Sequence, residues 1–345
     1  MLSRSLKEQI ICRWREFRRE PSAFFWVVFM PVLWMVVLGF ALSDPKPETY
    51  GIGVVSSGKH KPNLVEILSK SSQIRLKAGD DATLKPLLQR GDITLIVAAM
   101  PNGIQFTLDP ANPEAIRAKD FTNGIIQTYA GRKDPLDAMI KPITAKGTRY
   151  VDFLIPGLLG LSIMTSSLFG VGMTIVSNRK ENLLKRYLTT PMKPYEYIVS
   201  HLVGRMNILV AEFIAVMLAG FIIFDFNVFG NYLAYIAVSV LGASAFTAVA
   251  LLCASRTKSI PMISGLTNLI SLPMIMLSGV FFSKNNFPDW LQTVTGYLPL
   301  TALNDALRKI ALEGQTIQQL SFEMLVLITY TVICGFIAHR AFKWY

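Results

Sequence analysis

Side chains that carry catalytic or metal chemistry are scarce in this chain. Cysteine and histidine each occur three times in 345 residues, at Cys12, Cys253, Cys334, His60, His201 and His339. These positions are too scattered to form a metal or redox motif, and no nucleophile motif accompanies them. The sequence therefore gives no positive support for an enzyme or for a metal site in this chain.

A phosphate-binding loop is also lacking, although residues 53–60 come close to one. They read GVVSSGKH, whereas the loop requires G-x-x-x-x-G-K followed by Ser or Thr. His60 replaces the hydroxyl that binds Mg²⁺, and Gly53 lies inside an expected strand instead of after it. We therefore expect no nucleotide and no other cofactor in this chain.

Long apolar runs are what the sequence has in abundance. They cover residues 22–42, 150–176, 203–224, 230–253, 260–282 and 322–342. Each can cross a hydrocarbon core, which takes about 20 residues of helix. Apolar residues make up 52% of the chain, more than a soluble protein of this length would contain. The sequence predicts an α-helical membrane protein with six transmembrane helices.

The net charge of +11 could indicate nucleic-acid binding, but its distribution favours a membrane interpretation. Outside the large polar insert, sixteen Lys and Arg fall on one side of the predicted spans: Arg4, Lys7, Arg13, Arg15, Arg18, Arg19, Arg179, Lys180, Lys185, Arg186, Lys193, Arg205, Arg256, Lys258, Arg340 and Lys343. Three fall on the other side, Lys284, Arg308 and Lys309. Because short cytoplasmic loops are rich in Lys and Arg, we expect both termini in the cytoplasm and no nucleic-acid partner.

Residues 1–21 predict a cytoplasmic helix that lies in the membrane interface, ahead of the first span at 22–42. Leu6, Ile10, Trp14 and Phe17 recur at helical spacing, with charges between them. A basic face beside a bulky apolar face suits contact with membrane lipid. The alternative is a solvated basic tail.

Residues 43–149 have the patterning of a water-soluble domain. Strands are predicted at 50–57, 74–79, 93–100 and 104–110, and helices at 61–71, 81–91 and 115–130. The order β-α-β-α-β-β-α predicts a small extracytoplasmic α/β domain. Residues 150–345 then hold transmembrane helices two to six.

Two membrane segments have an unusual composition. Residues 150–176 are rich in Gly, Ser and Thr, which predicts close packing against another helix of this chain or of a partner. Residues 283–314 are too polar for a full crossing and too apolar for a free loop. Pro288 and Pro299 would break this segment into an outer re-entrant helical hairpin, which Phe287 and Trp290 would anchor in the membrane.

Glu212 is the one clear ionisable residue deep within a predicted span. Such residues are costly in a membrane, so a functional role is one hypothesis. The other is a structural glutamate that is hydrogen-bonded to Ser, Thr or Asn of a neighbouring helix. The sequence leaves these two alternatives open.

The loop at 177–202 is long for a connector between spans. Residues 180–188 predict a short basic helix that ends at Thr189-Thr190-Pro191, and the chain re-enters the membrane from Tyr195 onward. The simple alternative is an ordinary positively charged loop. Its length and its internal helix favour a docking site for a cytoplasmic partner.

This loop resembles the coupling segment of the type-2 ABC transporter permeases, R-E-x-x-x-L-x-x-L-x-x-T-P followed by a return helix that ends in G-[KR]. The matching residues are Arg179-Lys180-Glu181, Leu184, Tyr187-Leu188, Thr190-Pro191 and Gly204-Arg205. A second match runs through LSGVFF (277–282), FP (287–288), WL (290–291), LPLT (298–301) and DALR (305–308). The insert is similar to the outer domain of the longer subclass, with its element order and its DPANP run at 109–113. Asn182-Leu183 departs from the Gly-Thr pair that is common in the loop.

The resemblance implies a permease subunit that pairs with a second copy or a close paralogue. Each subunit would dock one of two cytoplasmic ABC ATPase chains, which bring the ATP and Mg. Docking would use Glu181, Leu184, Lys185, Arg186, Tyr187, Leu188, Thr190 and Pro191. Leu184, Tyr187 and Leu188 are expected to fill a groove of the ATPase, with the charged residues at its rim.

The resemblance further implies that spans two and five line a pathway. Candidate residues are Ser162, Ser166, Glu212, Asn268, Ser271, Met274 and Phe281. The expected function is ATP-driven export of an amphipathic or lipid-like compound across a bacterial inner membrane. Two alternatives remain: a transmission protein that couples ATP hydrolysis to motion of the outer domain, and a proton-coupled carrier that depends on Glu212.

Overall fold

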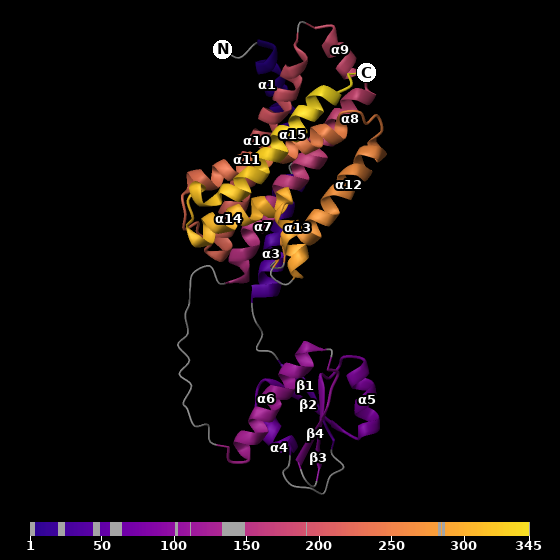
Figure 1. The fold of residues 1–345 in the computed structure, drawn as a ribbon, viewed down its shortest axis with the longest axis vertical. Helices are drawn as coiled ribbons and strands as arrows, with labels where there is room; N and C mark the ends of the chain where they lie inside the picture. Colours follow the sequence, from indigo (N-terminus) through magenta and orange to yellow (C-terminus); the bar gives the residue numbers. More distant parts are fainter. Residues whose placement is uncertain are drawn as a thin grey trace. The chain divides into compact units, whose positions relative to one another are not determined.

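The computed structural model describes residues 4–19, 25–43, 49–55, 64–100, 103–110, 112–132, 149–190, 192–281, 284 and 287–344. The chain divides into two compact units, one of residues 44–143 and one of residues 1–43 with 144–345 (Figure 1). Each unit is described by itself below.

The unit of residues 44–143 is a four-stranded sheet with helices on both faces. Its elements are β1 (Tyr50–Val55), α4 (Leu64–Ser69), β2 (Ile74–Gly79), α5 (Asp81–Gln89), β3 (Leu95–Met100), β4 (Gly103–Thr107) and α6 (Pro113–Tyr129). The strand order is β2-β1-β3-β4, and only the β3–β4 pair is antiparallel. The predicted order of strands and helices is confirmed.

Successive residues of β1 point to opposite faces of the sheet, and each face is covered by its own layer of helices. Ile52 and Val54 face a core shared with α4 and α6, which includes Leu68 and Ile126. On the other face, α5 packs Leu84 toward Gly53, where an added Cβ would lie 2.8 Å from Ile93. Gly53 therefore lies inside β1 and lets α5 approach it, which removes the first glycine from any phosphate-binding role. Residues 56–60 of the near-match lie outside the described residues.

The other unit is helical. Its elements are α1 (Arg4–Arg19), the π-helical η1 (Phe25–Phe29), α3 (Met30–Ser43), α7 (Tyr150–Thr165), the π-helical η2 (Ser166–Val171), α8 (Gly172–Lys180), α9 (Leu183–Leu188), α10 (Pro194–Phe224), α11 (Tyr232–Ala254), α12 (Ile260–Leu277), α13 (Asp289–Gly296), α14 (Pro299–Glu313), the 3-10 turn η4 (Ile317–Leu320) and α15 (Ser321–Ala341). Segments α7, η2 and α8 continue one another as a single helix.

Five of these helical stretches are long and apolar enough to cross a membrane: 150–180, 195–224, 232–254, 260–277 and 317–341. The first predicted span is represented by a shorter apolar helix, Phe25–Ala41. The share of buried residues is 72% for 150–180 and 61% for 232–254, but 28% or less for the other three. The α7–α8 helix and α11 therefore form the interior, and α10, α12 and α15 surround them.

The predicted hairpin at 283–314 is present as two helices. Pro288 precedes the first turn of α13, and Pro299 is the first residue of α14, so both prolines break the chain where the sequence indicated. Trp290 is exposed on α13, Phe287 is partly buried, and Pro299 is buried in α14. Because α14 packs against α7, α11 and α15, this helix belongs to the protein interior.

The small residues of the α7–α8 helix contact helices of the same chain. Gly160 lies against Asn304 of α14, and Gly157 lies against the Val280 carbonyl and the Arg308 side chain. Arg308 donates to the carbonyls of Phe153, Gly279 and Val280, which joins α14 to α7 and to the end of α12. Close packing against another helix of the same chain, one of the two alternatives, is therefore observed at Gly157 and Gly160, and association with a second copy stays a prediction.

Replacing Gly160 with alanine is expected to lower the thermal unfolding midpoint of the purified protein. The new methyl would overlap Oδ1 of the buried Asn304, so this side chain must move within the packed α7–α14 contact, and such overpacking costs about 1–3 kcal/mol. Gly170→Ala is the matched control, because nothing lies within 4 Å of its added Cβ. Equal midpoints for the two variants would contradict this account of the α7–α14 contact.

Candidate functional site

The turn between α8 and α9 depends on one residue with a left-handed backbone. Asn182 has φ 58°, a conformation that Gly adopts freely and that Asn tolerates better than most residues. The coupling segment that this loop resembles commonly has a glycine at this position, and Asn is one of the few other residues that adopt this conformation. The hydroxyls of Thr189 and Thr190 then bond back to the carbonyls of Arg186 and Tyr187, which ends α9.

Helix α9 has an inner and an outer face. Leu184 is fully buried within this chain, and Tyr187 is half-buried against Tyr197. The expectation that Leu184 and Tyr187 fill a groove of a partner is therefore wrong for Leu184 and fits Tyr187 only in part, because both anchor α9 to its own subunit. Side chains of Glu181, Lys185, Arg186 and Thr190 are exposed on the outer face. Pro191 and the side chain of Leu188 lie outside the described part.

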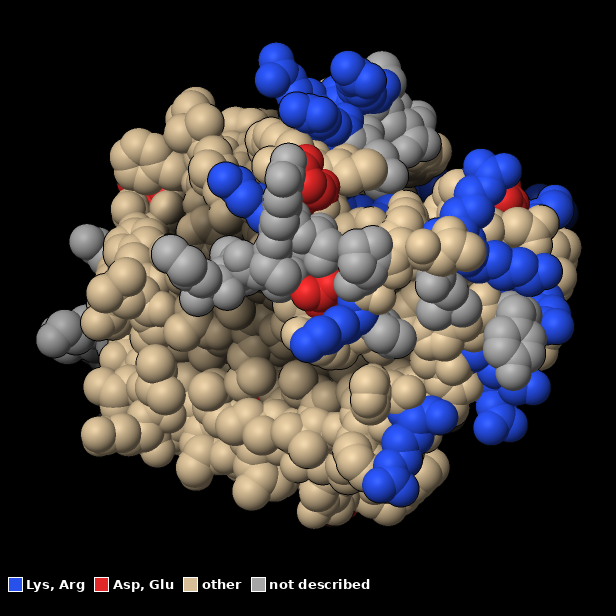
Figure 2. Space-filling model, turned by 90° about the horizontal axis from the view of Figure 1, so that it is seen from above, with Lys and Arg blue, Asp and Glu red and all other residues tan. Residues whose placement is uncertain are grey.

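The end of the helical unit that carries α9, here called the α9 end, is strongly basic. Figure 2 looks onto this end and shows Lys and Arg side chains gathered over it, with few acidic ones. Its exposed cations are Lys7, Arg15, Arg18, Arg19, Lys180, Lys185, Arg186, Lys193, Arg256, Lys258, Arg340 and Lys343. A surface of this kind attracts an acidic protein surface or an anionic membrane.

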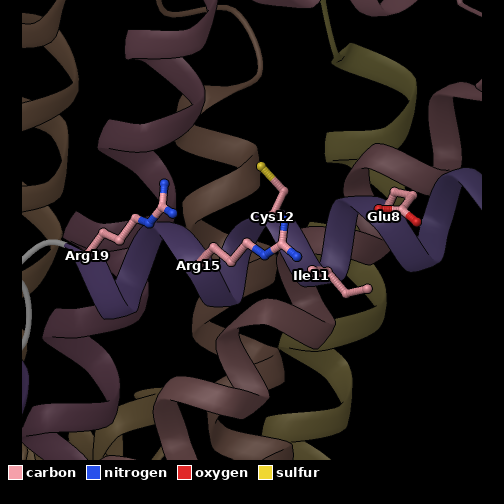
Figure 3. A pocket seen from close by; sticks show the side chains of 5 residues that line it. All are labelled: Glu8, Ile11, Cys12, Arg15 and Arg19. Atoms are coloured by element: carbon pink, nitrogen blue, oxygen red, sulfur yellow. The ribbon is translucent and has the colours of Figure 1, made fainter.

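Helix α1 packs along α10 and contributes to the α9 end. Ile10 is half-buried, whereas Trp14 is exposed, and the side chains of Leu6 and Phe17 are outside the described part. On the outer side of α1, a shallow groove of about 260 Å³ is lined by Glu8, Ile11, Cys12, Arg15 and Arg19 (Figure 3). The predicted helix is confirmed; its contact with lipid stays a prediction.

Arg179 connects α8 to two distant parts of the chain. Its guanidinium donates to the carbonyls of Ala254 at 2.6 Å and Ser255 at 3.1 Å, and also to that of Thr257, in the turn between α11 and α12. It also donates to the carbonyl of Lys343 at 2.8 Å, beyond the end of α15. The sequence counted Arg179 only as a charge on one side of the spans; in the structure it is buried and joins the end of α8 to the end of α11 and to the C-terminal residues.

Arg205 and Glu212 form an ion pair inside the helical unit. Nη2 of Arg205 lies 2.8 Å from Oε2 of Glu212, and both side chains have no exposed surface. Arg205 also donates to the hydroxyls of Ser166 at 2.8 Å and Ser167 at 2.7 Å, at the start of the π-helical η2. The pair therefore joins α10 to the centre of the α7–α8 helix, at a π segment of the kind often found at functional sites.

The structural hypothesis for Glu212 is confirmed in part, because its carboxylate is hydrogen-bonded to Ser162 and Ser166 of the neighbouring helix. The sequence did not indicate its charged partner. Arg205 was counted only as a charge on one side of the spans, but α10 runs unbroken from Pro194 to Phe224 and places Arg205 in its buried face. The sequence did hold a signal for this pairing, because Arg205 and Glu212 both lie in the predicted span 203–224 and are seven residues, about two helical turns, apart.

The candidate pathway residues do not form one group. Ser162 and Ser166 lie beside Glu212, within the cluster around Arg205. On α12, Ser271 and Met274 are buried, whereas Asn268 is exposed near the middle of the helix. Phe281, whose carbonyl accepts a bond from Tyr150, is partly buried after the end of α12.

Known proteins resemble this chain over most of its length. Residues 21–340 match the model of a family described as ABC-2 family transporter protein. A probable multidrug ABC transporter permease, YbhR of Escherichia coli (strain K12), is similar at 20% identity over 350 residues, covering 92% of each chain. Nodulation protein J of Rhizobium meliloti (strain 1021) is 26% identical over 195 residues, 56% of this chain and 73% of that protein.

A third similar protein is much longer than this chain. ABC transporter G family member 20 of Dictyostelium discoideum is 20% identical over 197 residues, 55% of this chain. The match spans 26% of the length of that protein.

Proposed function

Because this chain belongs to the ABC-2 family of transporter proteins, we propose that it is the permease subunit of an ATP-driven exporter, with ATP and Mg bound by a separate ATPase chain. The observation that carries the proposal is the two-faced helix α9. Its inner residue Leu184 is fixed in the core, and its outer residues Lys185 and Arg186 face away from the chain. A short helix anchored from within and charged outside is suited to docking another protein.

Docking at α9 would depend on two features: the positive charge of its outer face and the anchoring of its inner face in this chain. Lys185, Arg186 and the nearby Lys180 give the outer face a positive charge, so an acidic rim on the ATPase is the complementary surface. Leu184 keeps the helix from rotating, so a movement of the docked ATPase passes into the helical unit. Glu181 would select partner groups that donate hydrogen bonds.

We place a second copy of this chain, or a close paralogue, against α12. Asn268 is exposed near the middle of this helix, on a surface that is otherwise apolar. An amide that faces hydrocarbon there would be costly, because lipid tails offer it no hydrogen-bond partner. Facing a second subunit and a polar pathway between the two copies removes this cost.

The proposed cargo is an amphipathic or lipid-like compound that leaves the inner leaflet or the cytoplasm of a bacterial inner membrane. The name of the similar Escherichia coli permease refers to multiple drugs, which supports such a cargo. The apolar surfaces of α10, α12 and α15 are also open to lipid-soluble molecules from the side.

Cysteine labelling tests the proposed topology of six spans with both termini cytoplasmic. In a variant without native cysteines, Lys185→Cys should react with a membrane-impermeant maleimide only after the membrane has been permeabilised. Ser72→Cys, exposed in the α/β unit, should react from outside in intact cells. The positive-inside rule predicts this result, and the reverse pattern would overturn both the orientation and the docking proposal.

Transport in vesicles tests the function itself. The chain purified with its bound ATPase would be reconstituted into liposomes, and uptake of a fluorescent amphipathic dye would be followed after external ATP is added. We expect uptake that requires both ATP and Mg. Hydrolysis of ATP without any dye movement, across dyes of different charge, would instead favour a transmission protein.

A further inference from the structure

An aromatic cluster at the α9 end joins α9 and α10 to the C-terminal residues, which are far from both in the sequence. Its centre is Tyr197, near the start of α10, which is fully buried. The Tyr197 ring lies 5.8 Å from Tyr187 of α9, 4.7 Å from His201 and 5.7 Å from Trp344 at the C-terminus, centroid to centroid. Phe342 packs 4.9 Å from Trp344 and completes the cluster.

Polar contacts fix the orientation of Tyr197. The amide of Asn178, in α8, donates to its hydroxyl at 3.2 Å. The guanidinium of Arg13, in α1, lies 5.6 Å from the centre of its ring and 3.2 Å from Nε2 of His201. Because a guanidinium can only donate, Nε2 of His201 must be the acceptor in this contact. Helices α1, α8, α9 and α10 therefore all meet at one side chain.

The C-terminal residues have a second connection to the same region. Arg179 donates to the carbonyl of Lys343 and lies 5.2 Å from the centre of the Phe342 ring. Residues 342–344 are thus attached to α8 through Arg179 and to α9 through Tyr197 (Figure 1 shows the C-terminus beside α8 and α9). We call these three residues the tail.

A helix of six residues is too short to be stable without tertiary contacts. The position of α9 therefore depends on what its inner face touches, and the tail packs against one of those contacts, the Tyr197 ring. We propose that the tail is a working part of the coupling device, with Tyr197 as the positioning residue that links α9 to α1, α10 and the tail. The inference rests on the proposed function, because a docked ATPase is what would move α9.

Two consequences distinguish this role from ordinary core packing. A packing defect lowers stability throughout the helical unit. Loss of the tail should instead loosen α9 selectively, although the two segments are more than 150 residues apart in the sequence. It should also reduce coupling while ATPase binding persists, because the outer residues of α9 are unchanged.

Hydrogen exchange on the full-length chain in lipid nanodiscs tests this inference. Trp344→Ala should speed amide exchange in residues 183–190 by about tenfold, because it removes the ring that packs against Tyr197 and Phe342. Exchange in α11 (Tyr232–Ala254) should stay as in the unmodified protein. Tyr197→Phe keeps the ring contacts and loses only the bond to Asn178, so it should speed this exchange less than Trp344→Ala does. Trp34→Ala, which removes an exposed tryptophan of α3, is the matched control and should change nothing in 183–190.

Deleting residues 342–345 should give the same selective loosening as Trp344→Ala. ATP hydrolysis by the co-purified ATPase would be measured on the same variants, with reduced dye uptake per ATP as the expected result. Unchanged exchange in 183–190 after both Trp344→Ala and the deletion would overturn the inference, as would equally faster exchange in α11. Failure of any ABC ATPase to bind the unmodified chain would refute the proposed function instead, while the exchange result would still decide the role of the tail.

Discussion

Replacing Glu212 with alanine should strongly reduce the amount of folded protein found in the membrane. The change leaves Arg205 as a fully buried charge whose carboxylate partner is gone. Breaking a buried ion pair from one side costs about 3–5 kcal/mol, which is a large part of the stability of a typical domain. Yield in detergent extracts and the thermal unfolding midpoint, both from size-exclusion chromatography, measure the loss.

Two further variants show whether the loss of stability comes from the broken ion pair or from the loss of a carboxylate as such. Arg205→Met combined with Glu212→Leu removes both charges and should recover much of the lost stability, because apolar replacements of a buried pair are often tolerated. Glu313→Leu, at an exposed position, is the control for loss of one carboxylate. A double variant as unstable as Glu212→Ala would contradict the account of the pair. A stable Glu212→Gln protein that has lost transport would point to a proton-coupled carrier.

Reversing the two charges on the outer face of α9 should abolish ATPase binding. Lys185→Glu with Arg186→Glu changes exposed side chains only, so the subunit should still fold and reach the membrane. Where a basic face meets an acidic one, placing like charges together costs several kcal/mol. We expect at least about a hundredfold weaker binding, corresponding to about 2.7 kcal/mol, measured by co-purification at a series of salt concentrations.

The control for this variant carries the same change in charge elsewhere on the α9 end. Arg256→Glu with Lys258→Glu alters two exposed residues in the turn between α11 and α12. This protein should keep its ATPase. If both double variants lost the ATPase equally, the net charge of the α9 end would determine binding instead of α9. If both variants kept the ATPase, α9 would be a simple connector.

Local patterns were sufficient to predict the elements of this fold. Pro288 and Pro299 indicated the two helices of the hairpin because proline favours the first turn of a helix and disrupts its interior. Alternating and periodic apolar residues gave the order of strands and helices in the α/β unit. These signals depend only on neighbours in the sequence, which is why they could be interpreted without a structure.

Burial of charged residues could not be predicted in the same way. Arg179 and Arg205 sit among basic loop residues, so a count of charges treats them like Lys180 or Lys185. Their burial depends on carbonyls and hydroxyls from other helices, such as the Ser255 carbonyl and the Ser167 hydroxyl. Contacts of this kind are set by tertiary packing and leave no local pattern.

The orientation of α9 was missed for a related reason. In six residues, a helix turns less than twice, so the spacing of Leu184 and Tyr187 shows that they share a face but not what that face touches. The sequence suggested a partner, whereas Tyr197 and the core of the same subunit are the contact. The contacts of the aromatic residues in the tail could not be predicted from the sequence. The residues beside them form no pattern that indicates what these rings touch.

Photo-crosslinking from α9 in native membranes tests the central claim most directly. A photoreactive amino acid at position 186, on the outer face, would be activated in cells, and the crosslinked protein identified by mass spectrometry. The account predicts a chain that contains G-x-x-x-x-G-K-[ST], the phosphate-binding loop that this subunit lacks. The same probe at position 256 is the control. The claim that α9 docks an ATPase would be contradicted if the probe at 186 crosslinked only to lipid or to this chain itself, in the same pattern as the probe at 256.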